Sequence, residues 1–238
     1  MTVSEIIKKL ESLENPANIA GMARFGIVTK KAFGVSAPVL KMLAKDVKKQ
    51  AEDRHQLALG LWETGIHEAR AVAYLIDDPK QVTEAQMESW VRDFDNWAIC
   101  DSTCGTLFSR TSFAYQKVFE WSGRDEEFIK RAGICLIAWL AVHDKKADDA
   151  RLAQFLPLLE NKSDDERNFV KKAVNWSLRQ IGKRNANLNK LAIETAEKIM
   201  SRGTKAARWI AADALRELNN EKTIARLTKK LSADKTVS

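Results

Sequence analysis

Apolar residues recur at helical spacing along almost the whole chain, and few residues interrupt them. Residues 2–5 form a capping box ahead of the first apolar stripe, which includes Ile6 and Leu10. Only 10 Gly and 4 Pro occur in 238 residues, too few for the many turns of a sandwich or barrel. Ala, Leu, Lys, Glu and Arg, which favour helices, are abundant. The sequence therefore predicts an all-α fold.

The helical segments are short and are joined by brief polar connections. Apolar stripes lie within residues 39–47, 57–62, 69–76, 87–94, 97–108, 128–139, 152–159, 169–174, 188–199, 210–215 and 224–231. A globular bundle and a solenoid of stacked helix pairs both fit this pattern. Trp97 and Arg131 are 34 residues apart and Arg131 and Trp176 are 45 apart, whereas HEAT and armadillo repeats are typically ~40–47 residues long. We therefore expect these residues to occupy equivalent helices of successive repeats and to line one surface.

A chain of this length can bury one sizeable core or form one elongated array. No conspicuous linker divides it, so we expect a single domain over residues 1–238. The tail from Ala233 onward is polar and is expected to fray.

The net charge of +7 and the isoelectric point near 9.3 favour a polyanionic partner, nucleic acid above all. No helix-turn-helix, zinc-finger or RNA-binding signature indicates that base sequence is read. The charge alone is equally compatible with a basic protein that binds no polyanion.

The cysteines and histidines predict neither a disulfide framework nor a metal site. Three cysteines lie in apolar helical surroundings, and three histidines lie far from them without ligand spacing. These residues are Cys100, Cys104, Cys135, His55, His67 and His143. A reducing cytoplasm is the simplest setting, and we expect no metal and no cofactor.

The chain shows no charged-then-apolar leader, and its longest apolar run, residues 134–142, is too short to span a bilayer. We therefore expect a cytoplasmic protein that is neither exported nor embedded in a membrane. The sequence itself does not determine the oligomeric state, and a monomer is expected.

Trp97 and Asp101 are four residues apart, which places an indole and a carboxylate on one face of a helix. A ring that attracts cations beside an anion indicates a site for a positively charged group. The alternative is a half-buried ring beside a solvated acid, and most of the other tryptophans, such as Trp62, Trp90 and Trp139, are better explained as core residues.

Several short strings occur in a characteristic order and spacing along most of the chain. They lie at residues 22–25, 61–63, 68–76, 96–101, 130–132 and 172–179. Together they resemble the AlkD-type DNA alkylation-repair glycosylases, which are built from HEAT-like helical repeats. The resemblance implies a HEAT-like solenoid with a concave basic groove.

The functional pattern of that family falls on named residues here. It implies that Asp101 is catalytic and that Trp97 and Trp176 contact the lesion, together with Phe25, where a Tyr is expected in the closest relatives. Arginine and lysine can hold DNA phosphates, and the candidates for backbone contacts are Arg131, Arg179, Lys172, Lys183 and Arg184.

The predicted function is therefore hydrolysis of the N-glycosidic bond of cationic alkylated purines in double-stranded DNA. Such a base is already a good leaving group, so one carboxylate can suffice where glycoside hydrolases need two. The alternatives are a non-catalytic HEAT-repeat scaffold for a protein partner and a damaged-DNA binder without turnover.

Overall fold

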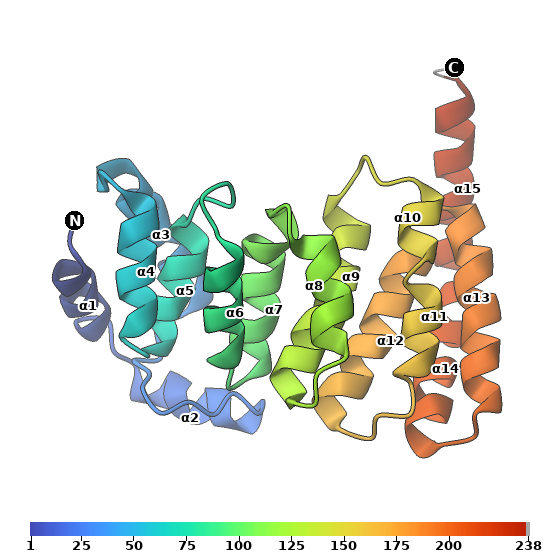
Figure 1. Ribbon diagram of the computed structural model, residues 1–238, viewed down its shortest axis with the longest axis horizontal. Coiled ribbons are helices and arrows are strands. Elements are labelled where there is room, and N and C mark those ends of the chain that lie inside the picture. Colours follow the sequence, from blue (N-terminus) through green and yellow to red (C-terminus); the bar gives the residue numbers. More distant parts are fainter. Residues whose placement is uncertain (237–238) are drawn as a thin grey trace. The chain divides into compact units, whose positions relative to one another are not determined.

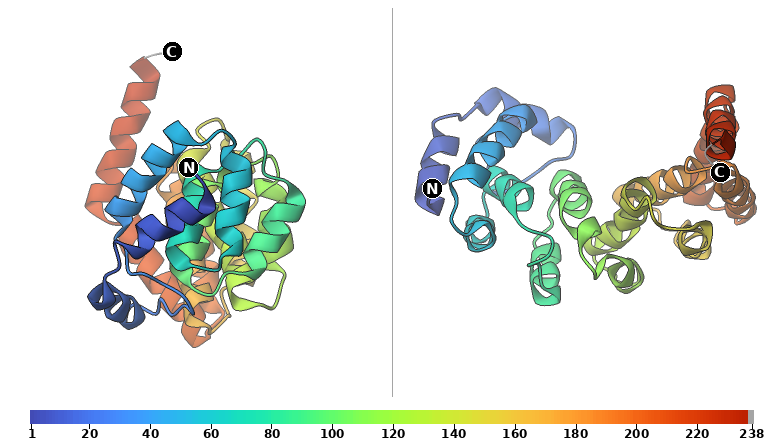
Figure 2. Two further views of the ribbon diagram at one scale, coloured as in Figure 1. Left: turned by 90° about the vertical axis from the view of Figure 1, so that its left-hand side faces the viewer. Right: turned by 90° about the horizontal axis from the view of Figure 1, so that it is seen from above.

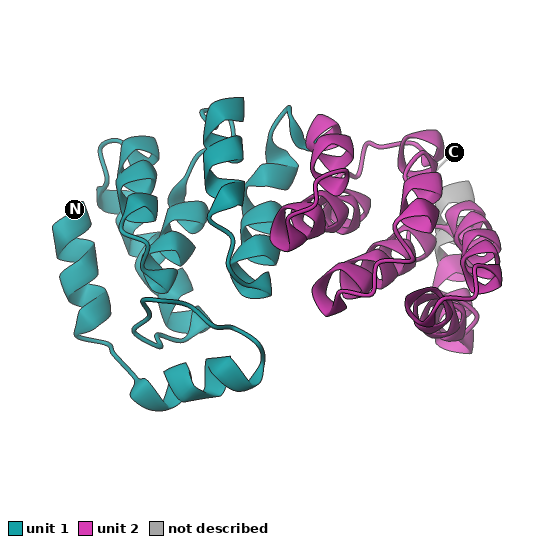
Figure 3. Ribbon diagram, turned by 60° about the horizontal axis from the view of Figure 1, so that its bottom comes forward, with its two compact units in different colours: residues 1–114 teal, residues 115–238 magenta. Residues whose placement is uncertain are grey.

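The structure, a computed structural model, describes residues 1–236, with side chains described through Lys229. Within that part of the chain every regular element is a helix and no strand occurs, as predicted (Figure 1). The chain divides into two compact units, Met1–Ala114 and Tyr115–Ser238 (Figure 3). The single domain predicted over residues 1–238 would include both of these units. No helix among the described residues is long and apolar enough to cross a membrane.

The first unit contains seven α-helices and one short 3₁₀ helix in its described residues. They are α1 (Val3–Glu11), α2 (Pro16–Arg24), α3 (Ala37–Gln50), α4 (Arg54–Glu63), α5 (His67–Ile76), α6 (Glu84–Arg92), α7 (Trp97–Thr106) and η1 (Phe108–Arg110). Helix α5 is central, because it packs against α1, α3, α4 and α7. Its buried alanines, among them Ala69 and Ala73, let these neighbours approach closely.

Aromatic side chains form the core between α4 and α6. The rings of Trp62 and Trp90 are stacked with their centroids 3.9 Å apart, and Phe94 and Phe108 pack around them. Both tryptophans are almost fully buried, which confirms their prediction as core residues.

Side-chain caps fix where several of these helices begin. The predicted capping box of α1 is present, since Thr2 accepts from the amide of Glu5 and the Glu5 carboxylate accepts from the amide of Thr2. Thr83 caps α6, and Asn96 rather than Asp95 caps α7.

The second unit is again helical throughout its described residues. Its helices are α8 (Ala114–Ser122), α9 (Glu127–His143), α10 (Asp149–Ala153), α11 (Leu156–Asn161), α12 (Asn168–Gly182), α13 (Ala186–Ser201), α14 (Lys205–Leu218) and α15 (Glu221–Thr236). Helix α12 packs against α9, α13 and α14. Gly133 of α9 lies so close to α8 that a Cβ there would be 2.5 Å from the amide nitrogen of Ser122. A glycine is therefore needed at this contact.

The C-terminal end of α15 extends past the other helices of its unit (Figures 1 and 2). The backbone is helical to Thr236, and the remainder of the tail predicted to fray lies outside the described residues.

Candidate functional site

Helix α7 carries the predicted pair Trp97 and Asp101 at its first turns. Asn96 is completely buried, and its side-chain oxygen accepts from the amides of Ala98 at 3.0 Å and Ile99 at 3.1 Å. This cap makes Trp97 the first residue of the helix, with Asp101 one turn later. Both residues are half-buried.

Trp97 is tied to Phe25, the residue that ends α2. The indole Nε1 donates to the main-chain oxygen of Phe25 at 2.9 Å. The Phe25 side chain is 74% exposed, the largest exposure among the exposed hydrophobic residues of the described chain. Phe and Tyr share the main-chain carbonyl, so replacing the expected Tyr with Phe leaves this contact intact.

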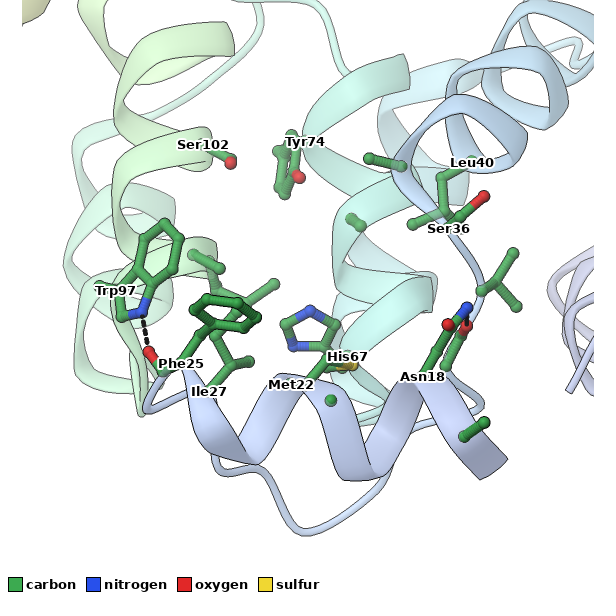
Figure 4. Close-up of a pocket in the computed structure, with 18 residues that line it drawn as sticks. Asn18, Met22, Phe25, Ile27, Ser36, Leu40, His67, Tyr74, Trp97 and Ser102 are labelled. Atoms are coloured by element: carbon green, nitrogen blue, oxygen red, sulfur yellow. Dashed lines mark hydrogen bonds between the residues drawn. The ribbon is translucent and has the colours of Figure 1, made fainter. Parts of the chain in front are cut away.

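Beside Trp97 lies an open pocket of about 550 Å³, bordered by residues of α2, α3, α5 and α7 (Figure 4). Its walls are mostly apolar, with Trp97 and Phe25 among them. The polar side chains of His67, Tyr74 and Ser102 also line it. No aspartate, glutamate, lysine or arginine occurs among the described residues of this lining. The pocket is therefore a large uncharged space next to the predicted site.

One buried carboxylate holds α2 over this pocket. Glu68 of α5 is completely buried and accepts from the amides of Phe33 at 2.9 Å and Gly34 at 2.7 Å. Gly34 has a φ of 73°, and its carbonyl accepts from Asn18 of α2 at 2.9 Å. A Cβ at Gly34 would clash with the main chain at Asn15, so only glycine fits here.

Burial changes the titration of two side chains in the pocket. Burial lowers the pKa of His67, and this effect outweighs the nearby charges of Glu68 and Asp95, which raise it. The imidazole is therefore neutral at pH 7. Its Nδ1 is buried and has no hydrogen-bond partner among the described residues. Burial also raises the pKa of Tyr74 by more than its interaction with the Ser102 side chain lowers it.

In the second unit, Arg179 and Lys183 lie one turn apart on α12 and share one carboxylate. The Nζ of Lys183 is 2.6 Å from Oε1 of Glu217 on α14, and Arg179 donates to the other oxygen of that carboxylate. Asp213 lies 3.7 Å from the Arg179 guanidinium. Burial would raise the pKa of Glu217, but the two cations outweigh it and lower that pKa. Both predicted phosphate contacts thus belong to an ion network in the free protein.

Trp176 is half-buried on the same helix and meets Trp139 edge to face, with ring centroids 5.3 Å apart. The residues on either side of it anchor α12. Asn175 donates at 3.0 Å to a carbonyl of α14, and Ser177 donates at 2.7 Å to a carbonyl of α9. These bonds fix the rotation of α12 and therefore the direction of Trp176.

The three remaining predicted backbone contacts differ in exposure. Arg131 of α9 is only 6% exposed and donates to the main-chain oxygen of Phe169. Arg184 is half-buried and donates to main-chain oxygens at the end of α9 and just after it. Of these three described residues only Lys172 is exposed. The role of each in binding a phosphate stays a prediction.

The structure thus brings Phe25 and Trp97 into contact in the first unit, with Asp101 one turn further along α7, and brings Arg179 and Lys183 together on one carboxylate in the second. Their functional roles stay predictions.

The sequence did not identify the pocket residues His67 and Tyr74. The signal available was their spacing, since His67, Ala71 and Tyr74 follow one another at i, i+4 and i+7 on α5 and share a face. That face was hidden by the stronger apolar stripe of Val72 and Ile76 on the same helix.

Comparison with known proteins places this geometry in context. The sequence model of a family described as "DNA alkylation repair enzyme" matches residues 6–218. A solved structure, described as a new family of proteins related to the HEAT-like repeat DNA glycosylases with affinity for branched DNA structures, superimposes with a TM-score of 0.74. It shares 20% sequence identity, over 91% of this chain and 95% of that chain. No curated protein sequence matches the chain. The structural likeness shows the fold and confirms the predicted class, an all-α HEAT-like helical repeat.

Proposed function

Because the chain belongs to the DNA alkylation repair enzyme family, we propose that it is a monofunctional DNA glycosylase. It hydrolyses the N-glycosidic bond of cationic alkylated purines, of the 3-methyladenine and 7-methylguanine type, in duplex DNA. The observation that carries this proposal is the pair formed by the Asp101 carboxylate and the Trp97 indole, one helical turn apart at the start of α7 and both on half-buried residues. A scaffold protein needs no such pair.

In this reaction the protein contributes mainly electrostatic stabilisation. The bond between the sugar C1′ and the base nitrogen breaks, and its electron pair neutralises the cationic base. Positive charge develops on the sugar, water adds at C1′, and the proton of that water passes to solvent. Asp101 stabilises the developing charge and orients the water. A unit-charge pair ~4 Å apart gains about 4 kcal/mol at an effective dielectric of ~20.

Aromatic side chains supply selectivity for a charged lesion. A desolvated cation–π contact is worth about 2 kcal/mol, so Trp97 and Trp176 favour an alkylated base over an unmodified one. Phe25 adds an exposed ring beside Trp97.

Positive side chains of the second unit hold the DNA backbone in this proposal. The family resemblance implies a concave basic groove, and the net charge of +7 supports the assignment of these residues to DNA binding. The residues are Arg131, Arg179, Lys172, Lys183 and Arg184. The protein acts as a monomer and needs no cofactor.

Lys172→Glu tests the backbone contacts most cleanly, because this side chain is exposed and its reversal leaves the core intact. We expect duplex affinity to fall about 3–10-fold and the slope of log K against log salt to decrease by about 1. Fluorescence anisotropy at several salt concentrations measures both. Lys190→Glu on α13, also exposed, makes the same change in net charge and should leave the slope closer to wild type. If the two variants had equal effects, Lys172 would act only through the net charge of the protein and not through a contact with a particular phosphate.

A second candidate function is a DNA binder without turnover. The affinity for branched DNA described for the structural relative favours it. A single-turnover incubation with methylated duplex DNA, followed by chromatography of the released bases, separates the two functions. Free alkylated base is expected from the glycosylase. A protein that binds the duplex, or a four-way junction, and releases no base is a binder only.

A further inference from the structure

A second, smaller pocket lies in the first unit, where α3, α5 and α7 end. Three cationic side chains line it, those of Lys48, Arg54 and Arg110, together with the hydroxyl-bearing Thr106. Its volume of about 160 Å³ is below the ~300–1,000 Å³ of pockets that hold a small organic molecule. This basic pocket therefore has room for a small anionic group and is too small for a nucleoside.

The three cations of the basic pocket have no carboxylate partner within 4 Å among the described residues. Two acidic residues also line the pocket, but each has partners of its own. Asp77 is buried, and its carboxylate contacts His55 at 2.8 Å and Gln86 at 2.7 Å. Asp78 accepts from the amide of Lys80 at 3.0 Å. The positive charge of the pocket is therefore not neutralised by ion pairs within the chain.

Holding these cations together is unfavourable for the free protein. Burial and the charges of Arg54 and Arg110 lower the pKa of Lys48. Arg54 is the first residue of α4, and a cation is disfavoured at the N-terminus of a helix. Arg179 and Lys183, which also lie close together, share the carboxylate of a glutamate instead. A bound anion would supply the negative charge that the chain does not place at the basic pocket.

We propose that the basic pocket binds one backbone phosphate of DNA. This inference rests on the proposed function for its DNA ligand, and it extends the phosphate contacts to the first unit. Lysine and arginine form charge-assisted hydrogen bonds to phosphate oxygens. Thr106 ends α7, the helix that Trp97 begins, so the two residues lie ~14 Å apart along the helix axis. This span equals about four steps of ~3.4 Å along one DNA strand, so a single duplex can reach both.

The double variant Lys48→Gln/Arg110→Gln tests the site, because it removes two of the three charges at exposed positions. We expect the affinity for an unmethylated duplex to fall at least about tenfold and the slope of log K against log salt to decrease by about 1. Fluorescence anisotropy at several salt concentrations measures both. The melting temperature should not fall, because the substitutions relieve repulsion between like charges.

Lys41→Gln/Lys49→Gln is the matched control. Both lysines are exposed on α3 and lie outside the lining of the basic pocket, and the net charge changes equally. We expect this control to keep an affinity and a salt slope closer to wild type. Inorganic phosphate provides a direct probe, and it should shift the NMR signals of the Thr106 and Arg110 amides in the wild type but not in Lys48→Gln/Arg110→Gln.

Three results would overturn the proposal. The first is that the double variant and its control bind the duplex equally well. The second is that the double variant melts at a lower temperature and binds the duplex like the wild type, which would assign the cations to stabilising the C-terminal ends of the helices. The third is that inorganic phosphate shifts both amides while duplex affinity is unchanged, which would assign the pocket to a free phosphate compound.

The duplex in this assay is unmethylated and no bond is cleaved. Absence of base release from methylated DNA would therefore contradict the proposed glycosylase and not the phosphate site. Base release by a protein whose duplex affinity ignores Lys48→Gln/Arg110→Gln would contradict the phosphate site alone.

Discussion

Asp101→Asn is expected to lower the release of alkylated base from methylated DNA by about 10²–10³-fold. The substitution keeps the shape of the side chain and one of its oxygens but removes the negative charge that stabilises the sugar in the transition state. Asparagine is nearly isosteric with aspartate, so the packing at the start of α7 should be preserved. Duplex affinity and thermal stability should therefore remain close to wild type.

Single-turnover incubation with methylated duplex, followed by chromatography of released bases, gives the rate. Asp46→Asn on α3 changes the net charge identically at an exposed position and serves as the control. Release by Asp101→Asn within a few fold of the control would remove this carboxylate from the mechanism. Loss of release accompanied by a lower melting temperature would assign it a structural role instead.

Glu68→Ala is expected to destabilise the protein by about 3 kcal/mol, because it leaves two main-chain amides without their acceptor in a buried place. These are the amides of Phe33 and Gly34, which Glu68 holds beneath α2. For a chain of this size the loss corresponds to a fall in Tm of about 6–12 °C. We also expect faster hydrogen exchange at both amides, since the segment that anchors α2 is released.

Chemical and thermal unfolding measure the first effect, and exchange of the two amides measures the second. Glu63→Ala at the exposed end of α4 removes the same group without a buried partner and should change the free energy of unfolding by less than ~0.5 kcal/mol. A Glu68→Ala protein as stable as this control would show that water or a rearranged loop replaces the carboxylate.

Local features of this fold could be predicted from the sequence, because their causes lie within a few residues. The capping box at Thr2, an N-cap at Asp95 or Asn96 and the buried Trp62 and Trp90 follow from spacing and residue type alone, and the structure selects Asn96. The i, i+4 relation of Trp97 to the residue one turn later on α7 is local in the same way.

Features that depend on distant partners could not be predicted. One wall of the pocket depends on Glu68, which accepts from the amide of Gly34, whose carbonyl in turn accepts from Asn18 of α2. Arg179 forms an ion pair with Glu217 on a different helix, and the periodicity of the sequence does not predict such a pair. The burial of Arg131 likewise follows from the packing of α9, which a sequence pattern shows only as a polar interruption in an apolar helix.

The two anchors of α12 have a consequence for how recognition can be altered. Asn175 and Ser177 point in nearly opposite directions, since two residues advance a helix by about 200°, and each grips a different neighbouring helix. Trp176 lies between them in the sequence and therefore points roughly at right angles to both anchoring side chains. A mutation at either anchor would therefore change the direction of Trp176, and with it the lesion preference, from a buried position. Screens for altered specificity should sample these interior sites as well as the surface.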